Sequence, residues 1–297
     1  MILLTGATGF LGSQLLIDLL NKNYKIVALK RSFSNTERIR KVLGDKKLNL
    51  VNIDLIDISE IFKLYSIDTI IHTATEYGRN ETPMYKMVEA NLLLPLRLAE
   101  EGVNKGVKTF INTDTYFNKG KGYYSNLLNY SFSKKSLMFC LPKISDKLKI
   151  INVILEHIYG PYDSDSKFVE NMIQNIAVQR VDKLSLTKGY QKRDFIYVHD
   201  VVSAYLKLIE YGRTHNFLLE TFELGTGQST EIREFCERIK LLSNSPTQLA
   251  FGDIPYRVDE IMGSKADISK LQKLGWKPTF SLSKGLEGIL NNYIGNI

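Results

Sequence analysis

The chain has few cysteines, few histidines and no long apolar run, and each shortage excludes a class of protein. Cys140 and Cys236 are the only cysteines among 297 residues, so we expect no disulfide framework and a reducing compartment. The four histidines show no metal-ligand spacing, and no metal site is predicted. No apolar run approaches the roughly 20 residues that a membrane helix needs. The first expected strand begins at Ile2, which leaves no room for a signal peptide, and the sequence predicts a cytoplasmic protein.

The charge of the chain excludes one further class of partner. Its net charge is +7, from 39 basic and 32 acidic side chains. The basic residues are scattered and form no continuous stripe, so nucleic acid is not an expected partner. A small phosphate-bearing ligand needs only a few local cations and is the better expectation.

Short β-rich runs alternate with amphipathic segments through the first half of the chain. Strands are expected at 25–29, 48–53, 69–72, 108–112 and 149–155, and helices at 85–101 and 130–141. This alternation predicts an α/β protein with a Rossmann-type, doubly wound parallel sheet. Beyond Gly160-Pro161 the elements become shorter. We therefore expect a nucleotide-binding domain at 1–165 and a smaller carboxy-terminal α/β substrate lobe at 166–297, with part of 195–212 returning to the first domain.

The first strand runs directly into three glycines, Gly6, Gly9 and Gly12. A tight strand-to-helix turn needs a residue without Cβ, and a pyrophosphate approaches the backbone only where side chains are absent. The helix expected from Phe10 then turns the positive end of its dipole toward the phosphates. Because the strand and the helix flank the glycines, the pattern predicts a dinucleotide site rather than an ordinary glycine-rich turn.

The end of the second strand bears on the choice of cofactor. An acid there would bind the adenosine ribose hydroxyls, but this strand ends in Lys30, Arg31 and Ser32. These residues suit a 2′-phosphate, with Arg31 forking two of its oxygens, so NADPH is favoured over NAD. The alternative is a solvated basic loop. Asp54, after the third strand, either contacts the adenine edge or caps the following turn.

Tyr130 and Lys134 stand four residues apart on one helical face. A lysine cation stabilises phenolate and lowers the tyrosine pKa, so the hydroxyl exchanges a proton near neutral pH. A surface pair is the alternative. Upstream, Thr113 and Thr115 lie at a strand end, and either hydroxyl is a candidate for binding the substrate oxygen.

The succession of motifs resembles the extended short-chain dehydrogenase/reductase superfamily, in the branch that acts on nucleotide sugars. The resemblance covers nearly the whole chain. It includes residues 5–12, 71–74, the Tyr130/Lys134 pair, 159–161, 191–198, 224–227 and 266–270. Residues 112–115 and 30–35 most resemble the subgroup of CDP-abequose and CDP-paratose synthases, which are 4-ketoreductases.

The resemblance implies a role for each matching residue. Tyr130 and Lys134 form a triad with a threonine, which is Thr115 when counted from Phe110 and Thr113 by the Thr-Asp pattern of some relatives. Further cofactor contacts are implied for Thr8, Phe10, Leu11, Leu55, His72, Thr73, Ala74 and Asn91. Substrate contacts are implied for Thr75, His157, Lys167, Phe168, Arg193 and Arg257, with both arginines on the diphosphate. For Arg193 the alternative is a structural pair with an acid such as Asp194 or Asp200.

The implied function is NADPH-dependent reduction of a 4-keto-6-deoxy or 3,6-dideoxy hexose linked to a nucleoside diphosphate, in deoxysugar biosynthesis for surface polysaccharide such as O-antigen. The glutamate that sugar 4,6-dehydratases carry after the threonine is missing, which argues against dehydration. An NAD-dependent 4-epimerase and a catalytically silent nucleotide-binding protein are the alternatives. Relatives are often homodimers, and the helices expected at 85–101 and 130–141 are the candidates for such an interface.

Overall fold

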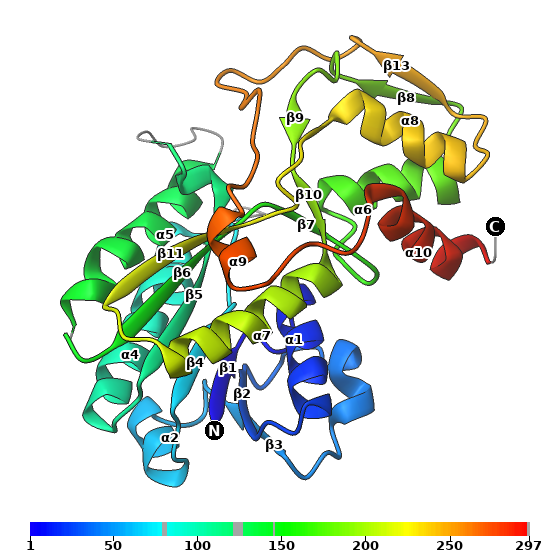
Figure 1. Ribbon diagram of the computed structural model, residues 1–297. Coiled ribbons are helices and arrows are strands. Elements are labelled where there is room, and N and C mark those ends of the chain that lie inside the picture. Colours follow the sequence, from blue (N-terminus) through cyan, green and yellow to red (C-terminus); the bar gives the residue numbers. More distant parts are fainter. Residues whose placement is uncertain (79–81, 121–126, 145, 296–297) are drawn as a thin grey trace. The chain divides into compact units, whose positions relative to one another are not determined.

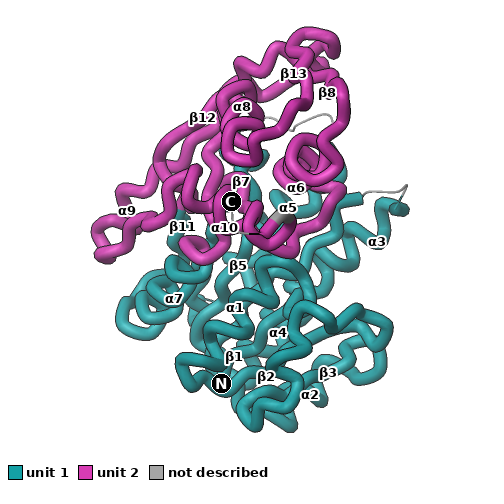
Figure 2. Tube along the Cα trace, turned by 90° about the vertical axis from the view of Figure 1, so that its right-hand side faces the viewer, with its two compact units in different colours: residues 1–155, 202–222 teal, residues 156–201, 223–297 magenta. Residues whose placement is uncertain are grey.

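The computed structural model describes residues 1–78, 82–120, 127–144 and 146–295, and it divides into two compact units (Figure 2). The first unit contains residues 1–155 and 202–222, and the second contains 156–201 and 223–297. The sequence placed the boundary near residue 165 and a return within 195–212. The structure divides the chain after Leu155 and returns to the first unit at Val202.

A sheet of seven strands forms the centre of the first unit (Figure 1). Its strands are β1 (Ile2–Thr5), β2 (Ile26–Lys30), β3 (Leu48–Asn52), β4 (Thr69–His72), β5 (Thr109–Thr115), β6 (Lys149–Leu155) and β11 (Leu219–Leu224). They lie in the order β11-β6-β5-β4-β1-β2-β3, and Leu3 of β1 is in parallel register with Val27 on one side and Ile70 on the other. The order therefore reverses at β1, where such sheets open a crevice for a nucleotide at the carboxyl ends of the strands. This confirms the predicted fold class.

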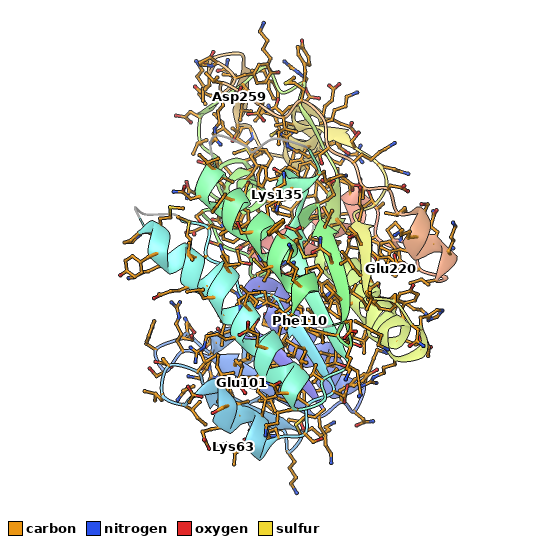
Figure 3. All side chains as sticks on the ribbon, turned by 90° about the vertical axis from the view of Figure 1, so that its left-hand side faces the viewer. Lys63, Glu101, Phe110, Lys135, Glu220 and Asp259 are labelled. Carbon is orange, nitrogen blue, oxygen red and sulfur yellow. The ribbon has the colours of Figure 1, made fainter. Side chains whose placement is uncertain are left out.

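Helices cover both faces of this sheet (Figure 1). Its central strands β1 and β2 are mostly apolar and buried, as strands covered on both faces are. The helical segments of the unit are α1 (Phe10–Asn21), η1 (Glu37–Val42), α2 (Ile58–Leu64), α3 (Met84–Val88), η2 (Glu89–Leu93), α4 (Leu94–Asn104), η3 (Tyr116–Asn118), α5 (Leu128–Cys140), η5 (Leu141–Lys143) and most of α7 (Val198–Thr214). Phe110 of β5, labelled in Figure 3, is fully buried in the core that also includes Leu98 of α4 and Leu137 of α5.

The helix expected at 85–101 is interrupted by the π-helical turn η2. Pro95 follows this turn and has no N–H to donate to the carbonyl of Asn91 four residues earlier, so a regular α-helix cannot continue through it. The widened turn carries Asn91, which is fully buried. The proline was visible in the sequence, but its effect on the helix was not predicted.

Three strand pairs and a helical core build the second unit. The pairs are β7 (His157–Tyr159) with β10 (Phe195–Tyr197), β8 (Lys183–Leu186) with β13 (Gln248–Phe251), and β9 (Lys192–Arg193) with β12 (Thr230–Glu231). Its helical segments are α6 (Phe168–Ile173), η6 (Gln174–Val178), α8 (Ile232–Leu242), α9 (Ser269–Lys273) and α10 (Leu282–Ile294). Apolar side chains of α6, α8 and α10, among them Phe235 and Leu286, form its core. Within the described ranges, the structure has no helix of the length and hydropathy needed to span a membrane.

Candidate active site

The glycine-rich turn has the shape that a phosphate cradle requires. Gly6 has a φ of +70°, and a Cβ on it would stand 2.6 Å from the backbone nitrogen of Ala74. A Cβ on Gly12 would stand 2.1 Å from the carbonyl oxygen of Gly6, so only glycine lets α1 pack this closely. Gly9 precedes Phe10, the first residue of α1, and has no side chain to occupy the first N–H groups of the helix. The turn therefore suits a pyrophosphate at a helix N-terminus.

A hydrogen-bond network joins the ends of β1 and β4 beside this turn. The Thr5 hydroxyl lies 2.8 Å from Nδ1 of His72 and accepts hydrogen bonds from the backbone nitrogens of Thr73 and Ala74, both at 3.2 Å. The Thr73 hydroxyl donates to the carbonyl oxygen of Thr5 at 2.7 Å. Complete burial lowers the pKa of His72 well below its usual value, so its imidazole is neutral. Thr5 was not predicted, and it organises three residues that were.

Other predicted cofactor contacts differ in how accessible they are. Phe10 is buried, whereas Thr8, Leu11 and the substrate candidate Thr75 are half-buried and Leu55 is exposed. The amide of Asn91 is engaged within the protein. Its oxygen accepts from the backbone nitrogen of Glu76 at 2.8 Å, and its nitrogen donates to the Glu76 carbonyl at 2.8 Å and to the Ser133 hydroxyl at 3.0 Å. In the structure Asn91 fixes the loop after β4 rather than presenting its amide to a ligand.

Asp54, in the turn after β3, contacts the loop that follows β2 and carries the predicted cations. The carboxylate of Asp54 accepts from the backbone nitrogen and the hydroxyl of Ser32, at 2.7 and 2.6 Å, and the bond from the Ser32 hydroxyl is the main cause of its lowered pKa. Lys30 donates to the carbonyl oxygens of Arg31 and Ser32, at 3.1 and 3.2 Å. The Arg31 guanidinium is exposed and lies over the ring of Phe33, 4.8 Å from its centroid. Arg31 therefore presents the accessible cation, while Asp54 engages Ser32.

The Tyr130/Lys134 pair lies on α5 and faces the protein interior. Tyr130 is 5% exposed and Lys134 is fully buried. The Lys134 ammonium donates to the carbonyl oxygen of Thr113 at 2.9 Å. Burial lowers the pKa of Lys134 to about 8 and raises that of Tyr130 well above 10. The sequence predicted a lowered tyrosine pKa, and that prediction is wrong for the free protein, because burial disfavours the phenolate. The free protein therefore holds a neutral phenol, the form that donates a proton.

The two candidate threonines have different partners. Thr115 forms a hydrogen bond with Tyr130 that lowers the pKa of the phenol, against the larger effect of burial. The Thr113 hydroxyl instead lies 2.6 Å from the hydroxyl of Tyr205, a fully buried residue of α7. Tyr205 was not predicted, and nothing near Thr113 in the sequence points to a partner 92 residues away.

Aromatic rings surround the phenol of Tyr130. The Tyr77 ring stacks on it with centroids 5.0 Å apart, and Phe117 meets it edge-on at 6.4 Å. Tyr116 and Tyr77 both act to raise its pKa. None of these three residues was a predicted site residue.

In the second unit, the two predicted arginines differ in burial. Arg193 is 7% exposed, and its guanidinium forms a buried ion pair with Glu260 and donates to the carbonyl oxygens of Lys192 and Ile261. Arg257 is exposed. Glu260 was not predicted, and it lies 67 residues from Arg193 in the sequence.

The acids suggested as alternative partners of Arg193 have other partners. Asp194 accepts hydrogen bonds from the backbone nitrogens of Thr226, Gly227 and Ala266. Asp200 accepts from the backbone nitrogens of Thr279 and Phe280 and from the Thr279 hydroxyl. A structural pair for Arg193 is therefore present, but with an acid other than the two suggested.

The remaining substrate candidates lie near β7 and the start of α6. His157 packs edge-on against Phe195 at 5.7 Å, and burial, followed by the charge of Arg193, lowers its pKa to about 3. Its imidazole is therefore neutral. Lys167 forms an ion pair with Asp163 at 2.9 Å. Phe168 is 36% exposed and packs against Phe195 and Phe235.

Among the described residues, no group of three or more histidines, cysteines or acids is arranged to hold a metal ion. A family model described as the NAD dependent epimerase/dehydratase family matches residues 2–219, about three quarters of the chain. The chain belongs to this family. It is an NAD(P)-dependent oxidoreductase, and the predicted resemblance is confirmed.

Two curated relatives extend over the whole chain. A CDP-abequose synthase of Salmonella muenchen is 38% identical over 294 residues, which are 98% of this chain and 97% of the relative. A CDP-abequose synthase of Salmonella typhimurium is 31% identical and covers 97% of both chains. A dTDP-4-dehydro-6-deoxyglucose reductase of Escherichia coli is more distant, at 24% identity, and covers 98% of this chain and 96% of its own.

Solved structures share the fold at lower identity. UDP-glucose 4-epimerase from Thermotoga maritima has a TM-score of 0.82 at 22% identity, covering 98% of this chain and 97% of its own. UDP-glucuronic acid 4-epimerase from Bacillus cereus has a TM-score of 0.81 at 24% identity, covering 98% of both chains.

Proposed function

We propose that this protein uses NADPH to reduce the 4-keto group of a nucleoside-diphosphate-linked 4-keto-6-deoxy or 3,6-dideoxy hexose. The observation that carries the proposal is the arrangement around Tyr130, whose neutral phenol is hydrogen-bonded to Thr115 and lies on the same helix as the buried ammonium of Lys134. The names of the CDP-abequose synthases and of the 4-dehydro-6-deoxyglucose reductase support the substrate class.

Each residue of this arrangement has a distinct task. The bound cofactor supplies the hydride for C4 of the sugar. Tyr130 donates its proton to the C4 oxygen as the carbonyl becomes an alcohol, and Thr115 holds that oxygen. Lys134 stabilises the phenolate left behind, and its bond to the Thr113 carbonyl keeps the ammonium in place. A water-derived proton then restores the phenol.

The first unit offers a fitting site for the dinucleotide. A Cβ at Gly6 or Gly12 would meet the protein's own backbone, so the glycines let β1, α1 and the loop after β4 pack closely around the turn to which we assign the pyrophosphate. We assign the 2′-phosphate of NADPH to Arg31, because its guanidinium is exposed and Lys30 bonds the same loop. The carboxylate of Asp54, which accepts a hydrogen bond from Ser32, would repel a 2′-phosphate and so disfavours NADPH.

For the substrate, we assign the nucleoside diphosphate to the second unit. Arg257 is exposed and available to a phosphate, whereas Arg193 must exchange Glu260 for the ligand. Phe168 and the neutral imidazole of His157 suit contacts to an uncharged sugar or base, and Lys167 adds a cation near the start of α6.

An NAD-dependent 4-epimerase is the second candidate, and the bond between Asp54 and Ser32 favours it. A carboxylate at the ribose corner is the feature expected for NAD. The two functions are separated by the purified protein itself. An epimerase retains bound NAD and interconverts its sugars without net oxidation, whereas the reductase consumes one NADPH for each keto sugar.

We further propose that the protein is a cytoplasmic homodimer that contributes to surface polysaccharide such as O-antigen. The helices α3 to α5 carry exposed apolar side chains, including Tyr85, Leu93 and Phe139, which are 59%, 47% and 69% exposed. Such side chains fit a helical interface between two copies. Sedimentation of the purified protein gives its mass, and a monomer would reject the assignment.

A further inference from the structure

Asp114 is a buried acid for which the proposed chemistry has no role. Its side chain is 6% exposed and lies on β5 between Thr113 and Thr115, so it points to the opposite face of the strand from both hydroxyls. One carboxylate oxygen accepts from the backbone nitrogen of Thr115 at 2.8 Å and from the amide of Asn118 at 2.9 Å. The other accepts from the amide of Asn152 at 3.1 Å. Burial raises the pKa of Asp114, and the three N–H donors act against it, because each favours the ionised carboxylate.

Asn152, which donates a hydrogen bond to Asp114, also accepts one from a neighbouring side chain. The side-chain oxygen of Asn152 accepts from the amide of Asn112 at 2.8 Å, and the same amide lies 3.4 Å from the sulfur of Met138 on α5. Asn112 and Asn152 are 0% and 5% exposed. A buried polar chain thus runs from α5 through β5 and β6 to Asp114.

The segment that Asp114 grips is the one that reaches Tyr130. The carboxylate bonds the first and the last residue of the stretch from Thr115 to Asn118. Thr115 is hydrogen-bonded to Tyr130, and the Phe117 ring meets Tyr130 edge-on. Both contacts therefore depend on a turn whose two ends are joined through one carboxylate.

We propose that Asp114 is a positioning residue that braces the turn from Thr115 to Asn118 and so holds the Thr115 hydroxyl against the Tyr130 phenol. The assignment rests on the proposed function. Because the bracing group is an anion, it also acts on the charges of the reacting pair. Its field raises the pKa of Lys134 and that of Tyr130. Within the described ranges, the other titratable groups facing this pair are Tyr77 and Tyr116 around the phenol and the neutral His72 near the ammonium.

Two variants separate the brace from the charge. Asp114→Asn removes the anion and sets its new amide against the amide of Asn152, two donors facing one another. We expect kcat for keto-sugar reduction to fall about tenfold or more, with KM for both substrates little changed, as for a misplaced reacting group. The alkaline limb of the pH profile should move to lower pH by roughly half a unit or more, because both pKa values fall. Asn118→Ala removes one bond of the brace and keeps the anion, so it should lower kcat without moving that limb.

Asp200→Asn is the matched control, since Asp200 is also a buried acid that accepts three hydrogen bonds, in the second unit. It should lower the melting temperature and leave the pH profile in place. An Asp114→Asn enzyme whose alkaline limb stays at the wild-type pH, with only its melting temperature lowered, would overturn the assignment. An Asn118→Ala enzyme with wild-type kcat would also overturn the assignment. This second variant decides the question if Asp114→Asn fails to fold. A wild-type protein that turns over no keto sugar instead rejects the proposed function, and the role of Asp114 falls with it.

Discussion

The hydroxyl of Thr113 and the hydroxyl of Tyr205 lie 2.6 Å apart in the interior of the first unit. The hydroxyl of Thr113, one of the two candidates for binding the substrate oxygen, is therefore already hydrogen-bonded within the protein. The bond connects β5 to α7. The Lys134 ammonium binds the carbonyl oxygen of the same Thr113, so the position supports the lysine through its backbone.

The different partners of the two threonines predict different losses on mutation. Thr115→Val should lower kcat about 10- to 100-fold, since one positioned hydrogen bond to the reacting oxygen is lost. Its melting temperature should fall less than that of Thr113→Val, because the hydrogen bond that it loses from the Phe117 backbone nitrogen is long, at 3.4 Å. Thr113→Val should lower the melting temperature, because the buried Tyr205 hydroxyl loses its partner. Removing both hydroxyls in Thr113→Val/Tyr205→Phe should restore much of that stability. The reverse pattern of kcat and melting temperatures would make Thr113 the substrate-binding hydroxyl.

Deleting the phenol hydroxyl tests the proton donor. Tyr130→Phe keeps the ring that stacks on Tyr77 and should reduce kcat by about 10²–10⁴ while cofactor affinity is retained. Calorimetric titration with NADPH provides the control for folding. Near-normal turnover in Tyr130→Phe would mean that another group delivers the proton.

The lowered pKa of Lys134 predicts the pH dependence of reduction. Because its pKa is about 8, the ammonium is charged at neutral pH and loses its proton as the pH rises through that value. Stabilisation of the phenolate is lost with it, so kcat should fall above pH 8 in a profile measured with saturating substrates. Lys134→Arg keeps the charge at high pH and should move this limb upward. An unchanged limb in a folded Lys134→Arg enzyme would assign it to another group.

Cofactor choice depends on the loop after β2. Arg31→Ala should weaken NADPH binding about ten- to a hundredfold and NADH binding little, since a charge-assisted contact to the 2′-phosphate is removed. Asp54→Asn should strengthen the preference for NADPH, because it removes the carboxylate beside Ser32. Arg40, an exposed arginine paired with Glu37, provides the control as Arg40→Ala. Equal losses for both cofactors in Arg31→Ala would remove the argument for NADPH.

The two arginines of the second unit should respond differently to removal. Arg193→Ala leaves the half-buried Glu260 without its partner, and should lower the melting temperature, by at most the cost of about 3–5 kcal/mol for breaking a fully buried pair. Arg257→Ala should leave the melting temperature unchanged and raise KM for the sugar nucleotide, because this arginine is exposed. Thermal melting with and without a nucleoside diphosphate measures both effects. If Arg257→Ala melts normally and still responds fully to the nucleotide, Arg257 is not a diphosphate ligand.

What the sequence predicted well is what neighbouring residues determine. The glycine turn is encoded within residues 6–12, and the Tyr130/Lys134 pair follows from helical spacing alone. The strands at 69–72 and 149–155 have the predicted bounds because their apolar runs are short and sharply ended. Their alternation with helices predicted the parallel sheet.

What could not be predicted depends on residues that meet only in the folded chain. The partner of Arg193 is Glu260 and not the adjacent Asp194. The carboxylate of Asp194 already accepts hydrogen bonds from the backbone nitrogens of Thr226 and Ala266. Asp54, in the turn after β3, reaches Ser32, in the turn after β2. Such pairings have no local signal in one sequence, since an acid is equally compatible with solvent or with any of several partners.

Transfer of deuterium from labelled NADPH tests the central claim most directly. The purified protein is incubated with deuteride-labelled NADPH and a panel of 4-keto-6-deoxy and 3,6-dideoxy hexoses linked to different nucleoside diphosphates, and the product sugar is analysed by mass spectrometry and NMR. We predict one deuterium at C4 of the new alcohol, with one NADPH oxidised for each sugar reduced. Deuterium at another carbon, or conversion of the sugar with no consumption of NADPH, would contradict the account.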